Sequence, residues 1–288
     1  MRQYGGTPRD LKGTRWHGEP VKGRCIYIYA EQGFGDTLQF ARYTLMLVRM
    51  GARVLLEVQP ALQRLLEGLH PAVHVVIPGE ALPFSYDLHC PLLSLAKEFG
   101  TDLNSIPDEV PYIVPGAEVL AKWRPRFQQS KFRVGLVWSG NPDLSREGLR
   151  SIPMSQFAKV LHAPGAVFYS LQKGQAAKQL AETGLQAAIH DLDEDLQDFS
   201  DTAAVIAHLH LVITVDTAVA HLAGAMGKPV WILLPRSSDW RWLRDRVDSP
   251  WYPTAGLFRQ TVNGRWDDTL DEVQKQLAVL AAAYNVQD

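Results

Sequence analysis

The sequence contains few cysteines and no long apolar run. Of its 288 residues, 2 are cysteines, Cys25 and Cys90; these are too few for a disulfide framework, and no Cys/His spacing resembles a zinc site. No apolar stretch is long enough to cross a bilayer, and the polar residues 1–20 lack the apolar core of a signal peptide. These absences predict a reducing, cytoplasmic setting.

The sequence also lacks a surplus of charge of either sign. Its formal net charge is −2, so we expect no broad basic surface and no nonspecific binding of nucleic acid. Hydrophobic residues make up 46% and charged residues 21%, which is typical of a globular protein rather than a disordered one. The length suits two domains of ordinary size.

Short apolar runs alternate with segments of helical periodicity, in two successive series. The first series predicts strands at 24–30, 52–58, 73–77 and 86–92, and helices at 37–50 and 61–69. The second predicts strands at 132–138, 167–171, 188–192, 211–215 and 230–234, with helices at 118–129, 153–161 (capped by Ser151), 175–182, 202–209, 219–226 and 269–284. Apolar strands joined by helices indicate two doubly wound parallel sheets, which bind ligands beyond the carboxyl ends of their strands.

The segment 101–115 separates the two series. It contains Pro107, Pro111 and Pro115, and proline interrupts both helices and strand ladders. We therefore predict an N-terminal Rossmann-like lobe at 1–115, a C-terminal Rossmann-like lobe at 116–268, and a final helix at 269–288 that packs back across the lobes.

The first turn that could bind a ligand follows the first strand. Its residues Gln32, Gly33, Gly35 and Asp36 precede a helix, and glycine lets the backbone approach a ligand closely. Asp36 could cap the helix, act as a general base facing the cleft, or do both. The third glycine of a dinucleotide-binding fingerprint is missing, so this turn alone is a weak signal.

The second turn joins a β-branched strand to a helix of small residues. It runs through Asp216, Thr217 and Ala218 to His221, and the free amides and dipole at such a helix start can bind an anion, here a donor phosphate. The alternative is an ordinary strand-to-helix unit in which Asp216 or Thr217 caps the helix and His221 packs against a neighbour.

Loops after other strands of the second series supply polar and aromatic residues. Arg150 and Lys173 could neutralise a departing phosphate, although surface loops often carry such cations. Arg236, Asp239 and Trp240 could contact a base or sugar. The same loops also contain Asn141, Arg146 and Trp251. We expect Asn141 to lie near the donor or the acceptor, and Trp251 to anchor its loop.

Together these turns resemble the bacterial heptosyltransferase-like glycosyltransferases. The sequence is more closely similar to the glycosyltransferase-like domain that often follows tetratricopeptide repeats. The similarity rests on segments 30–40, 87–95, 150–153, 170–174, 215–224, 239–242 and 249–253. It implies a GT-B fold of two facing lobes, with the acceptor mainly on the N-terminal lobe and the nucleotide-sugar donor mainly on the C-terminal lobe.

The resemblance also implies inverting transfer without an obligatory metal or cofactor. The proposed base of the family matches Asp36, and its Asp-Thr turn matches Asp216, Thr217 and His221. The basic residue that meets the donor phosphates falls at Arg150, before Ser-Ile-Pro, where the family usually has Lys before Trp-Pro.

The repeats that usually precede this domain are absent from the sequence, which leaves the acceptor open. A glycan or protein hydroxyl is expected, and a partner chain could recruit it; peripheral membrane contact also stays open. The alternatives are a non-catalytic module that binds a nucleotide or a protein, and then a sugar-nucleotide epimerase of the same fold. The epimerase would need acidic residues from both lobes around the sugar.

Overall fold

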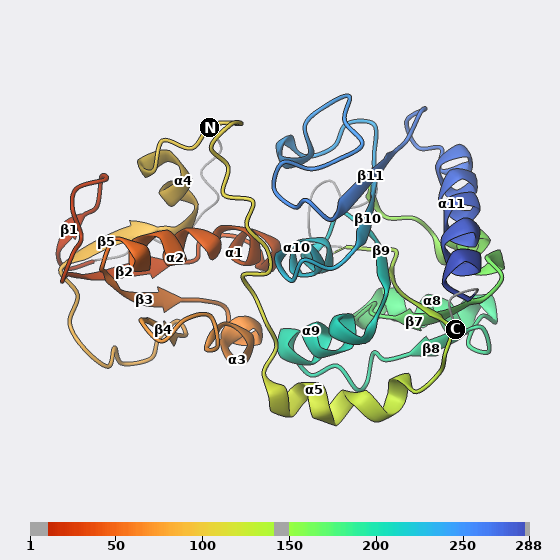
Figure 1. Cartoon of the computed structure of the whole chain (residues 1–288), viewed down its shortest axis with the longest axis horizontal. Coiled ribbons are helices and arrows are strands. Elements are labelled where there is room, and N and C mark those ends of the chain that lie inside the picture. The colour runs from red at the N-terminus through yellow and green to blue at the C-terminus, as the bar shows by residue number, and fades with distance from the viewer. Residues whose placement is uncertain (1–10, 141–149, 286–288) are drawn as a thin grey trace.

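The computed structural model describes residues 11–140 and 150–285, which form two parallel-stranded lobes side by side (Figure 1). The N-terminal sheet is five-stranded in the order β1-β5-β2-β3-β4, and the C-terminal sheet is six-stranded in the order β11-β10-β9-β6-β7-β8. The two lobes that the alternating pattern predicted are confirmed, each with its own parallel sheet.

The elements of the N-terminal lobe fall in two sets. Its strands are β1 (Thr14–Arg15), β2 (Cys25–Tyr29), β3 (Arg53–Glu57), β4 (Val73–Val76) and β5 (Leu88–Pro91). Its helices are α1 (Phe34–Phe40), α2 (Arg42–Arg49), α3 (Gln63–Leu66) and α4 (Leu95–Glu98), with short 3₁₀ turns η1 (Pro60–Leu62) and η2 (Leu92–Ser94). The predicted helix at 37–50 is two helices that meet at Ala41.

The C-terminal lobe is larger. Its strands are β6 (Phe132–Val137), β7 (Ala166–Ser170), β8 (Ile189–Asp191), β9 (Leu211–Val215), β10 (Val230–Leu234) and β11 (Ala255–Arg259). Its helices are α5 (Ala117–Trp123), α7 (Met154–Phe157), α8 (Gln179–Thr183), α9 (Phe199–His208), α10 (Ala218–Ala225) and α11 (Asp267–Asn285). The 3₁₀ turns are η3 (Arg124–Phe127), η4 (Ala158–His162), η5 (Gly174–Lys178) and η6 (Trp240–Trp242).

The two faces of the N-terminal sheet differ in what covers them. Ile26 and Ile28 of β2 share a core with residues of α1 to α4. On the opposite face Tyr27 belongs to a small cluster that contains no helical residue and is packed by loop residues such as Tyr86. Among the described residues, the helices of this lobe therefore contribute to one face of its sheet.

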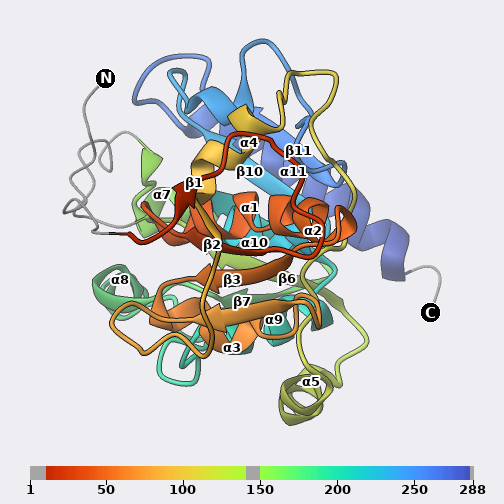
Figure 2. The same cartoon turned by 90° about the vertical axis from the view of Figure 1, so that its left-hand side faces the viewer.

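Two details of the C-terminal lobe correct the sequence predictions. The final helix α11 does not pack back across the lobes; its Leu270, Val273 and Leu277 share a core with β6, on the side farthest from the N-terminal lobe (Figures 1 and 2). Ser151 does not cap the helix that follows it, because Pro153 occupies that position and the Ser151 hydroxyl accepts from the backbone N–H of Gly140.

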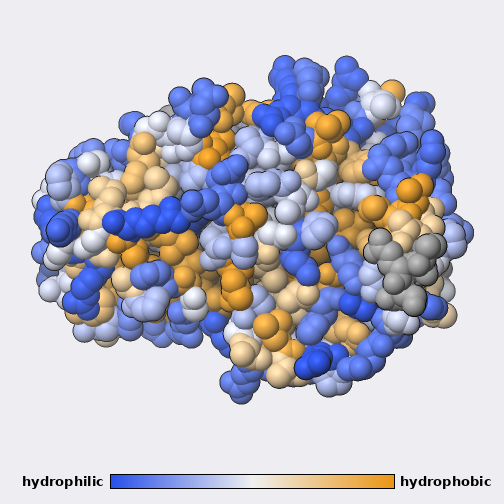
Figure 3. Space-filling view, viewed as in Figure 1, coloured by the Kyte–Doolittle hydropathy of each residue, from blue (hydrophilic) through white to orange (hydrophobic). Residues whose placement is uncertain are grey.

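The lobes share one continuous core, in which α1 packs directly on α10. The approach requires glycine at position 35, since a Cβ there would lie 2.7 Å from Cδ2 of His221. At another point of contact, Arg64 donates to both carboxylate oxygens of Asp198 at 2.7 and 2.8 Å and to Asp201 at 2.9 Å. Figure 3 shows apolar side chains on the surface at the junction between the two lobes. None of the helices in the described ranges is long and apolar enough to cross a membrane.

Candidate functional site

The start of α10 is built by Thr217. Its side-chain oxygen accepts from the backbone N–H of Val219 at 3.3 Å and hydrogen-bonds the Thr214 hydroxyl at 3.0 Å, so Thr217 rather than Asp216 is the helix cap. Apart from His221, the residues of α10 are small or apolar, and most of the helix is buried because it is enclosed between its own sheet and α1. The first-turn amides and the helix dipole of α10 therefore make a fixed electropositive end.

Asp216 is held partly buried just before this helix. Burial, followed by the nearby charge of Asp239, raises the pKa of its carboxyl to about 6. The Trp242 indole N–H, Arg150 and Arg241 act in the opposite direction. The carboxyl therefore lies among two cations and a second acid, and it titrates close to neutral pH.

Replacing Asp216 by Asn is expected to stabilise the protein at alkaline pH. The pKa of the folded carboxyl, about 6, lies above the ordinary 3.8, so the folded state holds the proton more tightly than the unfolded state. Ionisation then costs about 2–3 kcal/mol of stability above pH 6, and this cost disappears as the pH falls towards 4. Urea unfolding at pH 8, 6 and 4.5 should show a gain for D216N that shrinks with pH; an equal gain at every pH would contradict the assignment.

The glycine turn of the N-terminal lobe brings Asp36 to this place. The Oδ2 atom of Asp36 accepts from the backbone N–H of Gly33 at 3.0 Å, which confirms the predicted capping role at the start of α1. The carboxylate is 17% exposed. Burial raises its pKa, while Arg241 and the Gly33 N–H hold it down. A carboxyl with a raised pKa, placed between lobes, has the properties of a general base.

Arg241 of η6 crosses from the C-terminal lobe to this carboxylate. Its Nη2 pairs with Oδ1 of Asp36, its Nε donates to Oε1 of Gln39 at 2.6 Å, and its Nη1 donates to Oδ1 of Asp239 at 2.9 Å. Its guanidinium also lies 4.8 Å from the ring centre of Trp240. Asp239 caps η6 by accepting from the Arg241 N–H at 3.1 Å. Arg241 thus joins the glycine turn of the N-terminal lobe to the η6 loop of the C-terminal lobe. The sequence placed it within segment 239–242 but did not select it as a site residue.

His221 lies inside the contact between the lobes. Its Nδ1 pairs with the Tyr252 hydroxyl at 2.9 Å, and its ring stacks on Trp242 with centres 5.3 Å apart. Burial lowers its pKa well below the ordinary value, so the imidazole is neutral. This is the packing arrangement that the sequence left open as an alternative to phosphate binding.

The predicted phosphate cations lie in different surroundings. Arg150 is close enough to Asp216 to affect its ionisation. Lys173 pairs with Asp193 at 3.1 Å and is half-exposed. Asn141 and Arg146 lie outside the described residues.

The loop after β10 presents one aromatic surface. Trp240 is 58% exposed and makes an edge contact with Trp251, which is buried and anchors the loop as predicted. Arg236 is exposed and donates to the backbone oxygen of Thr261 at 2.6 Å. The Gln32 backbone oxygen accepts from Gln59 Nε2 at 2.6 Å, which braces the glycine turn. Trp240, beside Arg241, is therefore an exposed aromatic ring that could contact a sugar or base.

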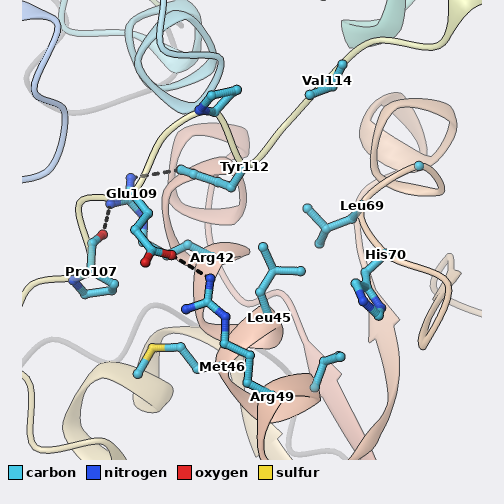
Figure 4. Close-up of a pocket in the computed structure, with 13 residues that line it drawn as sticks. Arg42, Leu45, Met46, Arg49, Leu69, His70, Pro107, Glu109, Tyr112 and Val114 are labelled. Carbon is cyan, nitrogen blue, oxygen red and sulfur yellow. Dashed lines mark hydrogen bonds and ion pairs between the residues drawn. The ribbon is translucent and has the colours of Figure 1, made fainter.

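A cavity of about 360 Å³ opens elsewhere, at the linker between the lobes (Figure 4). It is lined by α2, residues 68–70 and the linker, and the ion pair of Arg49 with Glu109 lies across it. None of the predicted site residues lines this cavity. Within residues 11–140 and 150–285, no group of three or more His, Cys, Asp or Glu side chains could hold a metal ion.

Comparison with known proteins supports the resemblance found in the sequence. Residues 155–267 match the family model of glycosyltransferase family 9 (heptosyltransferase). Among curated proteins, the chain is 26% identical over 298 residues to protein FlbA of Caulobacter vibrioides, covering 95% of this chain and 50% of that protein. The chain therefore spans about half the length of this relative.

Solved structures show the same fold. A glycosyltransferase family 9 protein from Veillonella parvula superimposes with a TM-score of 0.66 at 9% identity, covering 92% of this chain and 100% of that chain. The ADP-heptose LPS heptosyltransferase II of E. coli superimposes with a TM-score of 0.60 at 15% identity, covering 91% and 99%. The chain has the GT-B fold of these proteins, and its resemblance to heptosyltransferases is confirmed.

Proposed function

We propose that the protein is a bacterial, cytoplasmic glycosyltransferase that moves a sugar from a nucleotide-sugar donor to a hydroxyl of a glycan or protein, with inversion and without a metal or cofactor. The observation that carries this proposal is the meeting of two features. The start of α10 and the Asp36 carboxylate come from different lobes and lie close together, since α1 packs on α10 and a Cβ at Gly35 would lie 3.6 Å from the Ala218 Cα.

In this mechanism the donor phosphates lie at the start of α10, on the backbone amides of Thr217 and Ala218, since those of Val219 and Ala220 donate to Thr217. Asp36 takes the proton of the acceptor hydroxyl while the hydroxyl oxygen forms a bond to the anomeric carbon of the donor sugar. The bond from that carbon to the phosphate oxygen breaks on the opposite face, with oxocarbenium character at the sugar. Arg150 and Lys173 stabilise the departing nucleotide, for which Lys173 must leave Asp193.

The Caulobacter relative is about twice as long as the segment that this chain matches, which suggests how an acceptor could be recruited. The chain covers 50% of the Caulobacter protein. We propose that a partner chain or a further domain recruits the acceptor. The exposed Trp240 ring beside Asp36 would then stack on the transferred sugar or on the acceptor.

A second candidate is a non-catalytic module that binds a nucleotide or a protein. One observation favours it: both oxygens of the Asp36 carboxylate are occupied, one by Arg241 and one by the Gly33 N–H. Asp36 can act as a base only after one of these two contacts is broken.

Calorimetric titration with ADP-, UDP-, GDP- and CDP-sugars, together with an assay of donor hydrolysis, tests the proposed function. We expect one donor to bind and to be hydrolysed slowly, because a bound donor meets water when no acceptor is present. Binding without any turnover, even with glycan and protein acceptors added, would favour the non-catalytic module. Absence of binding by every donor would exclude the glycosyltransferase and a nucleotide-binding module, and would leave a protein-binding module.

A further inference from the structure

Among the described residues, the surroundings of Arg241 hold more negative charge than positive. Its guanidinium contacts Asp36 and Asp239, and its charge also acts on Asp216. Arg150 is the other cation that affects Asp216. A nucleotide-sugar would bring further negative charge to the start of α10, beside these carboxylates.

Arg241 could contact such a donor only by giving up one of its present partners. Arg241 is 11% exposed and already has a partner on each of its donor nitrogens. Two of these partners, Asp36 and Gln39, belong to the N-terminal lobe, while Arg241 itself belongs to the C-terminal lobe with α10. Its long side chain can therefore exchange a partner across the lobes for one on its own lobe without moving the backbone of η6.

We propose that Arg241 is a partner-switching positioning residue: it holds the Asp36 carboxylate while the donor site is empty and transfers to the donor diphosphate when the donor binds. This inference rests on the proposed function. The switch exchanges one charge-assisted hydrogen bond for another. It also frees the base only when a donor is present, which orders donor before acceptor.

The switch predicts that donor binding takes up protons. After Arg241 leaves, Asp36 faces Asp239 and the new phosphate charge. The interactions that still lower its pKa are those with the backbone N–H groups of Gly33 and of Asp36 itself. Asp216, which faces Asp239, Trp242, Arg150 and Arg241, gains the same anionic neighbour. Both carboxyl pKa values must rise, so both groups bind protons more tightly in the complex.

Calorimetry on the full chain with ADP, UDP, GDP and CDP, in buffers of different ionisation enthalpy at pH 7, measures affinity and proton uptake together. R241Q is expected to bind the nucleotide about 10- to 100-fold more weakly, and R241K to recover part of this loss. D36N is expected to bind it a few-fold to about tenfold more tightly, because Arg241 is no longer held away. Proton uptake should fall in both R241Q and D36N. The matched control is R246Q, which loses a surface pair with Asp248 in the same loop and should match wild type.

R241Q is expected to weaken nucleotide binding and D36N to strengthen it. If Arg241 only held the two lobes together, both variants would change the affinity in the same direction. The double variant D36N/R241Q should bind as R241Q does; an unchanged gain from D36N in that background would show simple charge repulsion and overturn the switch. Unaltered affinity and proton uptake in R241Q would overturn it as well. If the wild-type chain binds none of the nucleotides, the proposed function fails, and the switch fails with it.

Discussion

Replacing Asp36 by Asn is expected to lower the rate of sugar transfer by about 10²–10⁴-fold while nucleotide binding is retained. The amide keeps the size of the carboxylate, and its oxygen can still accept from the Gly33 N–H that now lies 3.0 Å from Oδ2. It cannot take a proton from the acceptor. The loss should therefore appear in transfer under single-turnover conditions, with donor affinity undiminished.

Two further variants make this result specific. Asp36→Ala should lose transfer to the same extent and also lose about 1 kcal/mol of stability, because the cap of α1 disappears. Asp268→Asn removes a carboxylate from an exposed pair with Arg265 and serves as a control with wild-type transfer. Undiminished transfer by folded D36N would show that another group acts as base.

Replacing Arg42 by Ala is expected to destabilise the protein by about 3–5 kcal/mol. Its side chain is buried and donates to the backbone oxygens of Gln39 and Trp251 at 2.9 Å, to the Tyr112 hydroxyl at 3.0 Å, and to the Pro107 backbone oxygen. Truncation leaves these acceptors without their donor inside the core and opens a cavity. Urea unfolding followed by tryptophan fluorescence measures the change in unfolding free energy.

The same helix supplies the control for this prediction. Arg49, also on α2, pairs with Glu109 while both side chains are mostly exposed, so Arg49→Ala should cost no more than about 1 kcal/mol. Arg42→Lys, which keeps the charge but reaches fewer acceptors, should fall between the two. Equal effects of Arg42→Ala and Arg49→Ala would contradict the role of Arg42 as a buried connection between lobes.

The strands and helices around the site could be predicted from sequence because their signals are local. The β-branched run 211–215 and the small residues after it gave β9 and α10 with nearly the observed bounds. The strand β11 was missed, since Ala255–Arg259 contains Gly256 and Arg259 and shows no clear apolar run. The strand β1 has 2 residues, too few to show any periodicity.

The connections between lobes could not be predicted, because they depend on residues far apart in sequence. Arg42 and Trp251 are 209 residues apart, and Arg241 and Gln39 are 202 apart. An arginine in a helix or a polar loop is usually solvated, and nothing local marks these two as interior. A cluster of aromatic residues was the available signal: Trp240, Trp242, Trp251 and Tyr252 lie close together in the sequence, around a loop that also carries Arg241.

The contacts of Arg42 also bear on how firmly the site is held. Arg42 joins α2 to the linker at Pro107 and to the C-terminal lobe at Trp251, so three parts of the molecule are fixed to one another at this buried point. Asp36 lies six residues earlier on adjoining helices, which sets a lever arm of roughly 9 Å at 1.5 Å per residue. A rotation of about 10° would displace the carboxylate by roughly 1.5 Å, which is enough to break a hydrogen bond. Since α1 also packs directly on α10, the shared core and Arg42 together hold the Asp36 carboxylate in place relative to the start of α10.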